Sequence, residues 1–114
     1  MENKIRKLLM RLGVDPAILG YTYLLDAVLL CYSDGVFLRE VTKLLYPSVA
    51  KKNQTSSLRV ERAMRHAIEN AHDINPNMCD QLFFQPSLIK GKYTNSQFIA
   101  ACVEQLKVED DENA

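Results

Sequence analysis

Apolar residues recur along this chain every three or four positions, and runs of strict alternation rich in β-branched residues are missing. Such spacing gathers apolar side chains on one face of a helix, so the chain is predicted to be all-α. The first stripe ends at Gly13, a residue type that readily takes the left-handed conformation that closes a helix. This stripe consists of Ile5, Leu8, Leu9 and Leu12.

The next stretch carries turn residues followed by a long apolar run. Asp15 and Pro16 fit the N-cap and first position of a short helical turn, and Gly20 is then expected to break the chain. Residues 23–32 are apolar almost all round, interrupted by Asp26, which predicts a central buried helix.

The middle of the chain predicts a helix, a tight connection and a second helix. Residues 36–46 form an amphipathic pattern, and Pro47 is expected to stop or redirect the chain there. A brief segment, 48–53, leads to the polar cluster 54–57, from which a hydroxyl can cap the next helix.

That second helix, about 57–72, has two contrasting faces. Apolar residues fall at helical spacing on the face predicted to be buried: Val60, Ala63, Met64, Ala67, Ile68 and Ala71. The opposite face gathers charged and imidazole side chains: Arg59, Glu61, Arg62, Arg65, His66 and Glu69.

The C-terminal third predicts two more helices, which makes about six in all. A short apolar segment, 78–84, is expected to be helical and 86–93 to be loop. The last helix opens at Thr94 with Gln97 three residues later, which fits a capping box. Its core stripe is predicted to be Phe98, Ile99, Cys102 and Leu106.

Length and composition limit the organisation to a single domain. A chain of 114 residues with 47% hydrophobic content can close one core but not two. We expect this domain to span 1–108 and the acidic, apolar-poor segment 109–114 to be a disordered tail. The sequence has no apolar run long enough to span a membrane, and its three cysteines argue against a disulfide framework. We therefore expect a cytoplasmic, DNA-associated location.

Charge is distributed unevenly even though the formal net charge is zero. Residues 39–66 hold seven lysines and arginines against two glutamates, a local net charge of +5. Phosphate binding requires such a basic surface, so double-stranded DNA is the partner that this segment favours.

Arginines on an open helix face suit the major groove of DNA. The groove is about 12 Å wide, and arginine donates two parallel hydrogen bonds to guanine, while a glutamate can accept from cytosine. The predicted base-reading residues are therefore Arg59, Glu61, Arg62, Arg65 and His66. Phosphate contacts, which set register, are predicted for Lys51, Lys52, Thr55, Ser56 and Ser57.

Other interpretations of these residues stay open. A helix face of this composition is often a solvated surface with local ion pairs, and His66 and His72 are each more typical of structural or surface histidines than of ligands. No metal-ligand spacing, phosphate-binding glycine loop or positioned nucleophile is found, so neither an enzyme nor a metal or other cofactor is predicted.

Several runs of sequence resemble one family. The stretches 43–47 (KLLYP), 50–52 (AKK) and 59–69 (RVERAMRHAIE), with further matches within 20–24 and 94–100, are similar to the C-terminal effector domain of the stage-zero sporulation protein A. Proteins of this family are response regulators that command entry into sporulation in Firmicutes. The resemblance covers nearly the whole chain.

The resemblance implies a six-helix, all-α domain with a central helix-turn-helix that binds DNA as tandem or dimeric copies. It places the base-reading positions on Arg59, Glu61 and Arg62, with Arg65 and His66 nearby. It also implies contact with an RNA polymerase sigma factor through residues 80–85.

The sequence also departs from the family pattern. Leu58 stands where the family usually has a serine, Leu25 and Asp26 replace an Arg-Glu pair, and His72 replaces a tryptophan. No receiver domain precedes Met1, so we expect a free-standing protein, with a fragment of a longer regulator as the alternative. A second hypothesis is a protein-interaction module or antagonist that pairs with a full-length relative and does not bind DNA independently.

Overall fold

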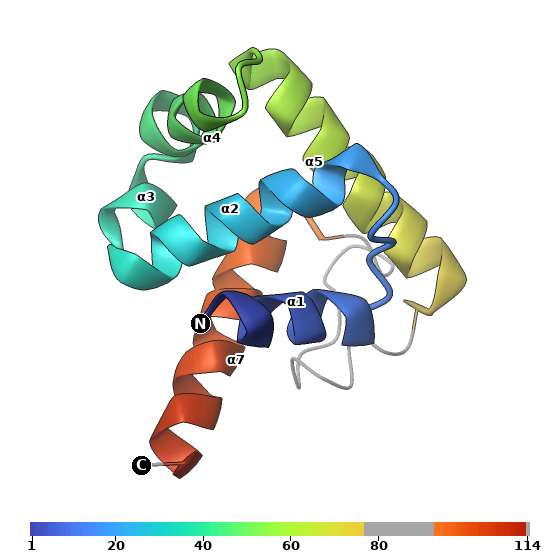
Figure 1. Cartoon of the computed structure of the whole chain (residues 1–114), viewed down its shortest axis with the longest axis vertical. Coiled ribbons are helices and arrows are strands. Elements are labelled where there is room, and N and C mark those ends of the chain that lie inside the picture. The colour runs from blue at the N-terminus through green and yellow to red at the C-terminus, as the bar shows by residue number, and fades with distance from the viewer. Residues whose placement is uncertain (77–92, 114) are drawn as a thin grey trace.

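The computed structural model describes residues 1–76 and 93–113, and within these ranges every regular element is a helix (Figure 1). This confirms the predicted all-α class. The elements are α1 (Glu2–Arg11), α2 (Leu19–Ser33), α3 (Val36–Arg39), the π-helix η1 (Val41–Leu45), α4 (Tyr46–Lys52), α5 (Ser57–Ile74) and α7 (Asn95–Asn113). The predicted segment 78–84 and nearly all of the predicted loop 86–93 lie outside the described residues.

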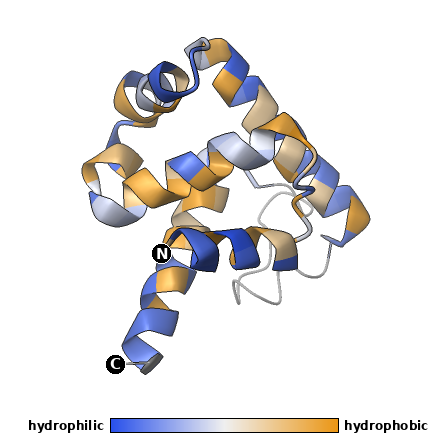
Figure 2. Cartoon of the chain, viewed as in Figure 1, coloured by the Kyte–Doolittle hydropathy of each residue, from blue (hydrophilic) through white to orange (hydrophobic). Residues whose placement is uncertain are grey.

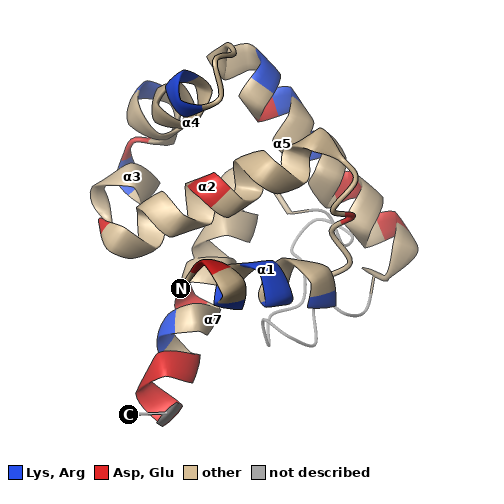
Figure 3. Ribbon diagram, in the orientation of Figure 1, with Lys and Arg blue, Asp and Glu red and all other residues tan. Residues whose placement is uncertain are grey.

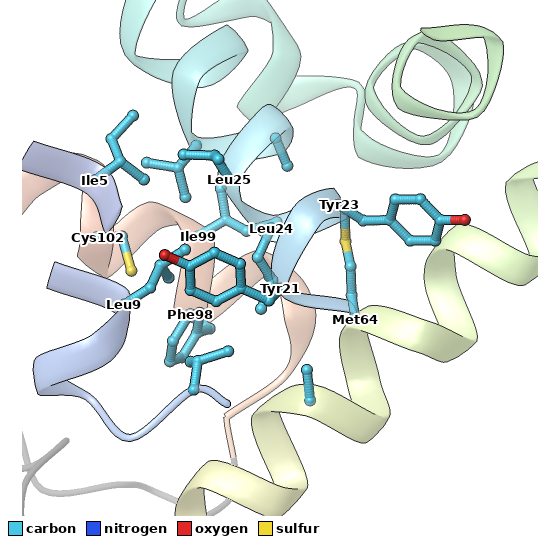
Figure 4. Packing of buried hydrophobic residues seen from close by; sticks show 14 of the residues in the cluster. Ile5, Leu9, Tyr21, Tyr23, Leu24, Leu25, Met64, Phe98, Ile99 and Cys102 are labelled. Carbon is cyan, nitrogen blue, oxygen red and sulfur yellow. The ribbon is translucent and has the colours of Figure 1, made fainter. Parts of the chain in front are cut away.

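Helix α2 lies at the centre and packs against α1, α5 and α7 (Figure 1). Its residues are hydrophobic or near neutral along most of its length (Figure 2). Its Leu24 meets Leu9 of α1 and Phe98 and Ile99 of α7 in one fully buried cluster (Figure 4). Burying an aliphatic side chain of this size contributes roughly 1.5–3 kcal/mol, so this cluster stabilises the arrangement of all three helices.

Helix α1 ends as the sequence predicts. Gly13 has a φ of 88°, in the left-handed region that favours glycine. Its amide donates to Met10 O at 3.0 Å, and the next amide, of Val14, donates to Leu9 O at 2.9 Å. This pair of hydrogen bonds is a Schellman motif, which satisfies carbonyls that the helix end leaves open.

Of two predictions for this part of the chain, one was confirmed and one was wrong. Asp15 and Pro16 begin a single turn, as expected: the Asp15 side chain accepts from the Ala17 amide at 2.9 Å, and the Ile18 amide donates to Asp15 O at 3.1 Å. Gly20 does not break the chain but lies inside α2, which already begins at Leu19. The glycine has a packing role there, because a side chain at this position would collide with α5.

The amphipathic stretch 36–46 is not one helix. It divides at Glu40, whose φ of −128° and ψ of 55° are not helical, into α3 and η1. Pro47 lies in the first turn of α4, which follows η1 without a break. The chain therefore stays helical through the proline and does not stop there.

Helix α7 begins at the predicted capping box. The Gln97 amide donates to Thr94 Oγ1 at 3.2 Å, and the Thr94 amide donates to Gln97 Oε1 at 3.0 Å. The helix then continues through Asn113, although 109–114 was expected to be disordered. Its acidic end is held by basic residues of α1, with Lys4 and Arg11 pairing with carboxylates at 2.6 and 3.0 Å.

Candidate nucleic-acid interface

The connection between α4 and α5 is a tight turn with a left-handed residue at its centre. Gln54 has a φ of 54°, which is rare for a residue other than glycine. Its amide donates to Lys51 O at 3.4 Å, and the Thr55 amide donates to Ala50 O at 3.0 Å, so α4 also ends in a Schellman motif. Ser56 then caps α5 by accepting the Arg59 amide at 3.2 Å. The direction of α5 is thus fixed relative to α4 within a few residues.

One face of α5 is buried against the core. Val60, Met64 and Ala67 are completely buried, as the spacing predicts. The small residues Ala63 and Ala67 lie against Gly20 of α2, so the two helices approach closely. Because this face is locked in place, the opposite face of α5 must point away from the core.

The outward face of α5 carries the predicted base-reading side chains. Arg59, Arg62 and His66 are exposed, and within residues 1–76 and 93–113 neither Arg59 nor Arg62 pairs with a carboxylate. Arg65 is also exposed, but its Nη1 lies 3.4 Å from Oε1 of Glu61 one turn earlier. Among the described residues, Arg59 and Arg62 therefore have no ion-pair partner, whereas Arg65 and Glu61 form a local pair.

The predicted phosphate-contacting residues have different environments. Lys51 is exposed at the end of α4, while Lys52 donates to Asp26 Oδ1 at 2.8 Å. Ser56 is exposed, and Thr55 and Ser57 are half-buried. Lysine and arginine positions are distributed over α4 and the first turns of α5 (Figure 3). The basic segment of the sequence thus maps to one region of the fold.

Sequence reasoning missed the role of Asp26. This buried carboxylate of α2 accepts hydrogen bonds from Lys52 and, at 2.9 Å, from Asn53 Nδ2. The hydrogen bond to Asp26 raises the pKa of Lys52 above its usual range. These contacts tie the end of α4 to α2, and the signal in the sequence was a carboxylate inside an otherwise apolar run.

Asn95, at the start of α7, is a second residue whose role was missed. Its Nδ2 donates to Tyr46 OH at 3.1 Å and to the backbone carbonyl of Glu61 at 3.0 Å. Asn95 is buried, and these two hydrogen bonds connect α7 to α4 and α5. A cleft of about 350 Å³ beside it is lined in part by Tyr46, Glu61 and Arg65.

The described residues offer little chemistry of other kinds. Among them, no group of three His, Cys, Asp or Glu side chains is placed to hold a metal ion. No helix within them is long and apolar enough to span a membrane. Cys31 and Cys102 are buried, and burial raises the pKa of the Cys31 thiol to about 11. Cys79 lies outside the described residues.

A short helix, a tight turn and a second helix that presents arginines to solvent define a helix-turn-helix protein of the DNA-binding class. The family model for sporulation initiation factor Spo0A C terminal matches residues 5–106. The chain belongs to this family, nearly over its whole length. It is a family of regulatory DNA-binding domains and not of enzymes, which places this chain among sporulation-related transcription regulators.

Proposed function

We propose that α5 enters the major groove of double-stranded DNA and reads base sequence. The observation that carries this proposal is the freedom of Arg59 and Arg62, which are exposed on a helix whose other face is fixed against α2. Free guanidinium groups can donate bidentate hydrogen bonds to guanine. The residues that we propose to read bases through hydrogen bonds are Arg59, Glu61, Arg62, Arg65 and His66.

Glu61 and Arg65 act differently in this proposal, because each is the other's partner in the free protein. A surface pair of this kind contributes only about 0.3–0.5 kcal/mol, so DNA can separate it at little cost. Arg65 is then available to a guanine or a phosphate, and Glu61 to a cytosine amino group.

Phosphate contacts in this proposal come from the end of α4 and the start of α5. Lys51 and the hydroxyls of Thr55, Ser56 and Ser57 flank the turn, where they can meet the backbone beside the groove. Lys52 is the weaker contributor, because its ammonium group already donates to Asp26. We further propose that two copies bind in tandem or as a dimer on DNA, and that a sigma factor is a second partner.

The test begins with selection of a preferred duplex from a random library, followed by anisotropy titrations. Arg62→Ala should cost about 1–3 kcal/mol on the selected duplex and much less on random DNA. Arg6→Ala on α1 is the matched control, because Arg6 is a surface arginine that pairs with Glu2 one turn away. Equal losses on selected and random DNA for both Arg59→Ala and Arg62→Ala would refute base reading.

Salt dependence tests the phosphate contacts separately. Lys51→Ala should weaken binding to all duplexes alike and reduce the slope of log affinity against log salt by about one. Lys52→Ala should change the slope by less than Lys51→Ala does. An unchanged slope for both variants would remove the end of α4 from the interface.

A further inference from the structure

An exposed leucine stands among the charged residues of α5. Leu58 lies in the first turn, directly before Arg59, and 56% of its surface is exposed. Among the described residues, the other exposed large hydrophobic side chains lie away from the first turns of α5: Met1, Met10, Leu19, Ile74 and Val108.

Helical geometry places Leu58 on the outward face. Positions four apart lie one above the other, so Leu58 is the neighbour of Arg62, while Val60 and Met64 lie on the buried side. Residues in the first turns of a recognition helix are those that reach base edges. Leu58 therefore occupies a base-reading position with a side chain that cannot form a hydrogen bond.

The base edges of the major groove offer a partner for such a side chain. They carry hydrogen-bond donors and acceptors together with the C5-methyl group of thymine, with which apolar side chains make contact. Resting on the proposed function of α5, we propose that Leu58 contacts the methyl group of a thymine adjacent to the base pair read by Arg62. Leu58 is then a specificity residue that selects thymine by its methyl group.

The test replaces thymines of the selected duplex by deoxyuridine one at a time, which removes the methyl group and preserves base pairing. For the unaltered protein, one such replacement should weaken binding about fourfold, as expected for loss of one buried methyl contact. Leu58→Ala should bind the thymine and uracil duplexes equally at that position. Leu19→Ala, which alters a leucine of similar exposure on α2, should keep the full sensitivity to the methyl group.

The results that overturn the inference differ from those that overturn base reading. If Leu58→Ala retains the sensitivity to uracil, or loses affinity equally on both duplexes, Leu58 makes no methyl contact even though DNA is read. If the unaltered protein prefers no duplex over random DNA, the proposed function itself fails. Circular dichroism of Leu58→Ala checks that the variant keeps its helices, which the exposure of the residue leads us to expect.

Discussion

Gly20 of α2 lies directly against the backbone carbonyl of Ala63 on α5. A Cβ atom added at position 20 would be 2.1 Å from that oxygen and 2.7 Å from the Cβ of Ala67. Backbone atoms cannot move aside as a flexible side chain can, so only glycine allows α2 and α5 to pack this closely. The position of α5, the helix that we propose to face DNA, thus depends on the absence of one side chain in the core.

Gly20→Ala should therefore destabilise the protein, even though alanine is the better helix former. We expect the free energy of unfolding to fall by about 2–3 kcal/mol, because overpacking outweighs the gain of up to about 1 kcal/mol in helix propensity. Urea denaturation measures this change. Gly35→Ala is the matched control, since nothing lies within 4 Å of a Cβ at that position. Equal stability of the two variants would contradict the close approach.

Gln54→Gly should stabilise the protein, in contrast to Gly20→Ala. The left-handed conformation of Gln54 costs roughly 1 kcal/mol for a residue with a Cβ, and glycine avoids this cost. Glycine also gives the unfolded chain more freedom, which offsets part of this gain. We therefore expect the free energy of unfolding to rise by about 0.5 kcal/mol, as measured by thermal or urea denaturation. A loss of stability would show that contacts of the glutamine side chain outweigh the backbone strain.

Much of the fold could be predicted from apolar periodicity and capping residues. Gly13 and the Thr94 capping box end and begin helices where expected, and the predicted stripe of α5 is buried except for Ala63, which is partly buried. These features are local, because each depends on residues only a few positions apart. The candidate recognition helix was found for the same reason.

What could not be predicted depends on contacts between distant segments. Gly20 resembles a helix breaker until α5 is known to lie against it. The pairing of Lys52 with Asp26 joins residues 26 positions apart, and an acidic tail is predicted to be disordered unless Lys4 and Arg11 are known to face it. Sequence spacing carries no information on such tertiary neighbours.

Asn95 and Tyr46 should be energetically coupled. Asn95→Ala leaves the Glu61 carbonyl and the Tyr46 hydroxyl without this donor, which should cost about 1–3 kcal/mol, and Tyr46→Phe should cost about 1 kcal/mol. The double variant has neither the Tyr46 hydroxyl nor its donor, so its loss in free energy of unfolding should be smaller than the sum of the losses of the two single variants. Strict additivity in urea denaturation would indicate that the hydrogen bond contributes nothing.

The acidic end of α7 should detach from α1 in acid. Hydrogen bonds from Lys4 and Tyr32 hold the pKa of Asp110 below its usual range. Burial raises the pKa of Glu109, but hydrogen bonds from Gln105 and Arg11 outweigh it and leave that pKa lowered as well. A carboxylate with a lowered pKa in the folded state stabilises the fold above its unfolded pKa, and this contribution disappears as the pH falls through the folded value.

Asp110→Asn isolates this contribution. The variant should be less stable than the unaltered protein at pH 7. The two stabilities should converge as the pH falls below the unfolded pKa of about 4 and then through the lowered folded pKa, because the carboxylate is then protonated in both states. Urea denaturation across this pH range measures the convergence. Asp111→Asn is the control, since Asp111 is exposed and makes no ion pair among the described residues. A constant difference between Asp110→Asn and the unaltered protein at every pH would mean that the Asp110 carboxylate does not need its charge to hold α7 against α1.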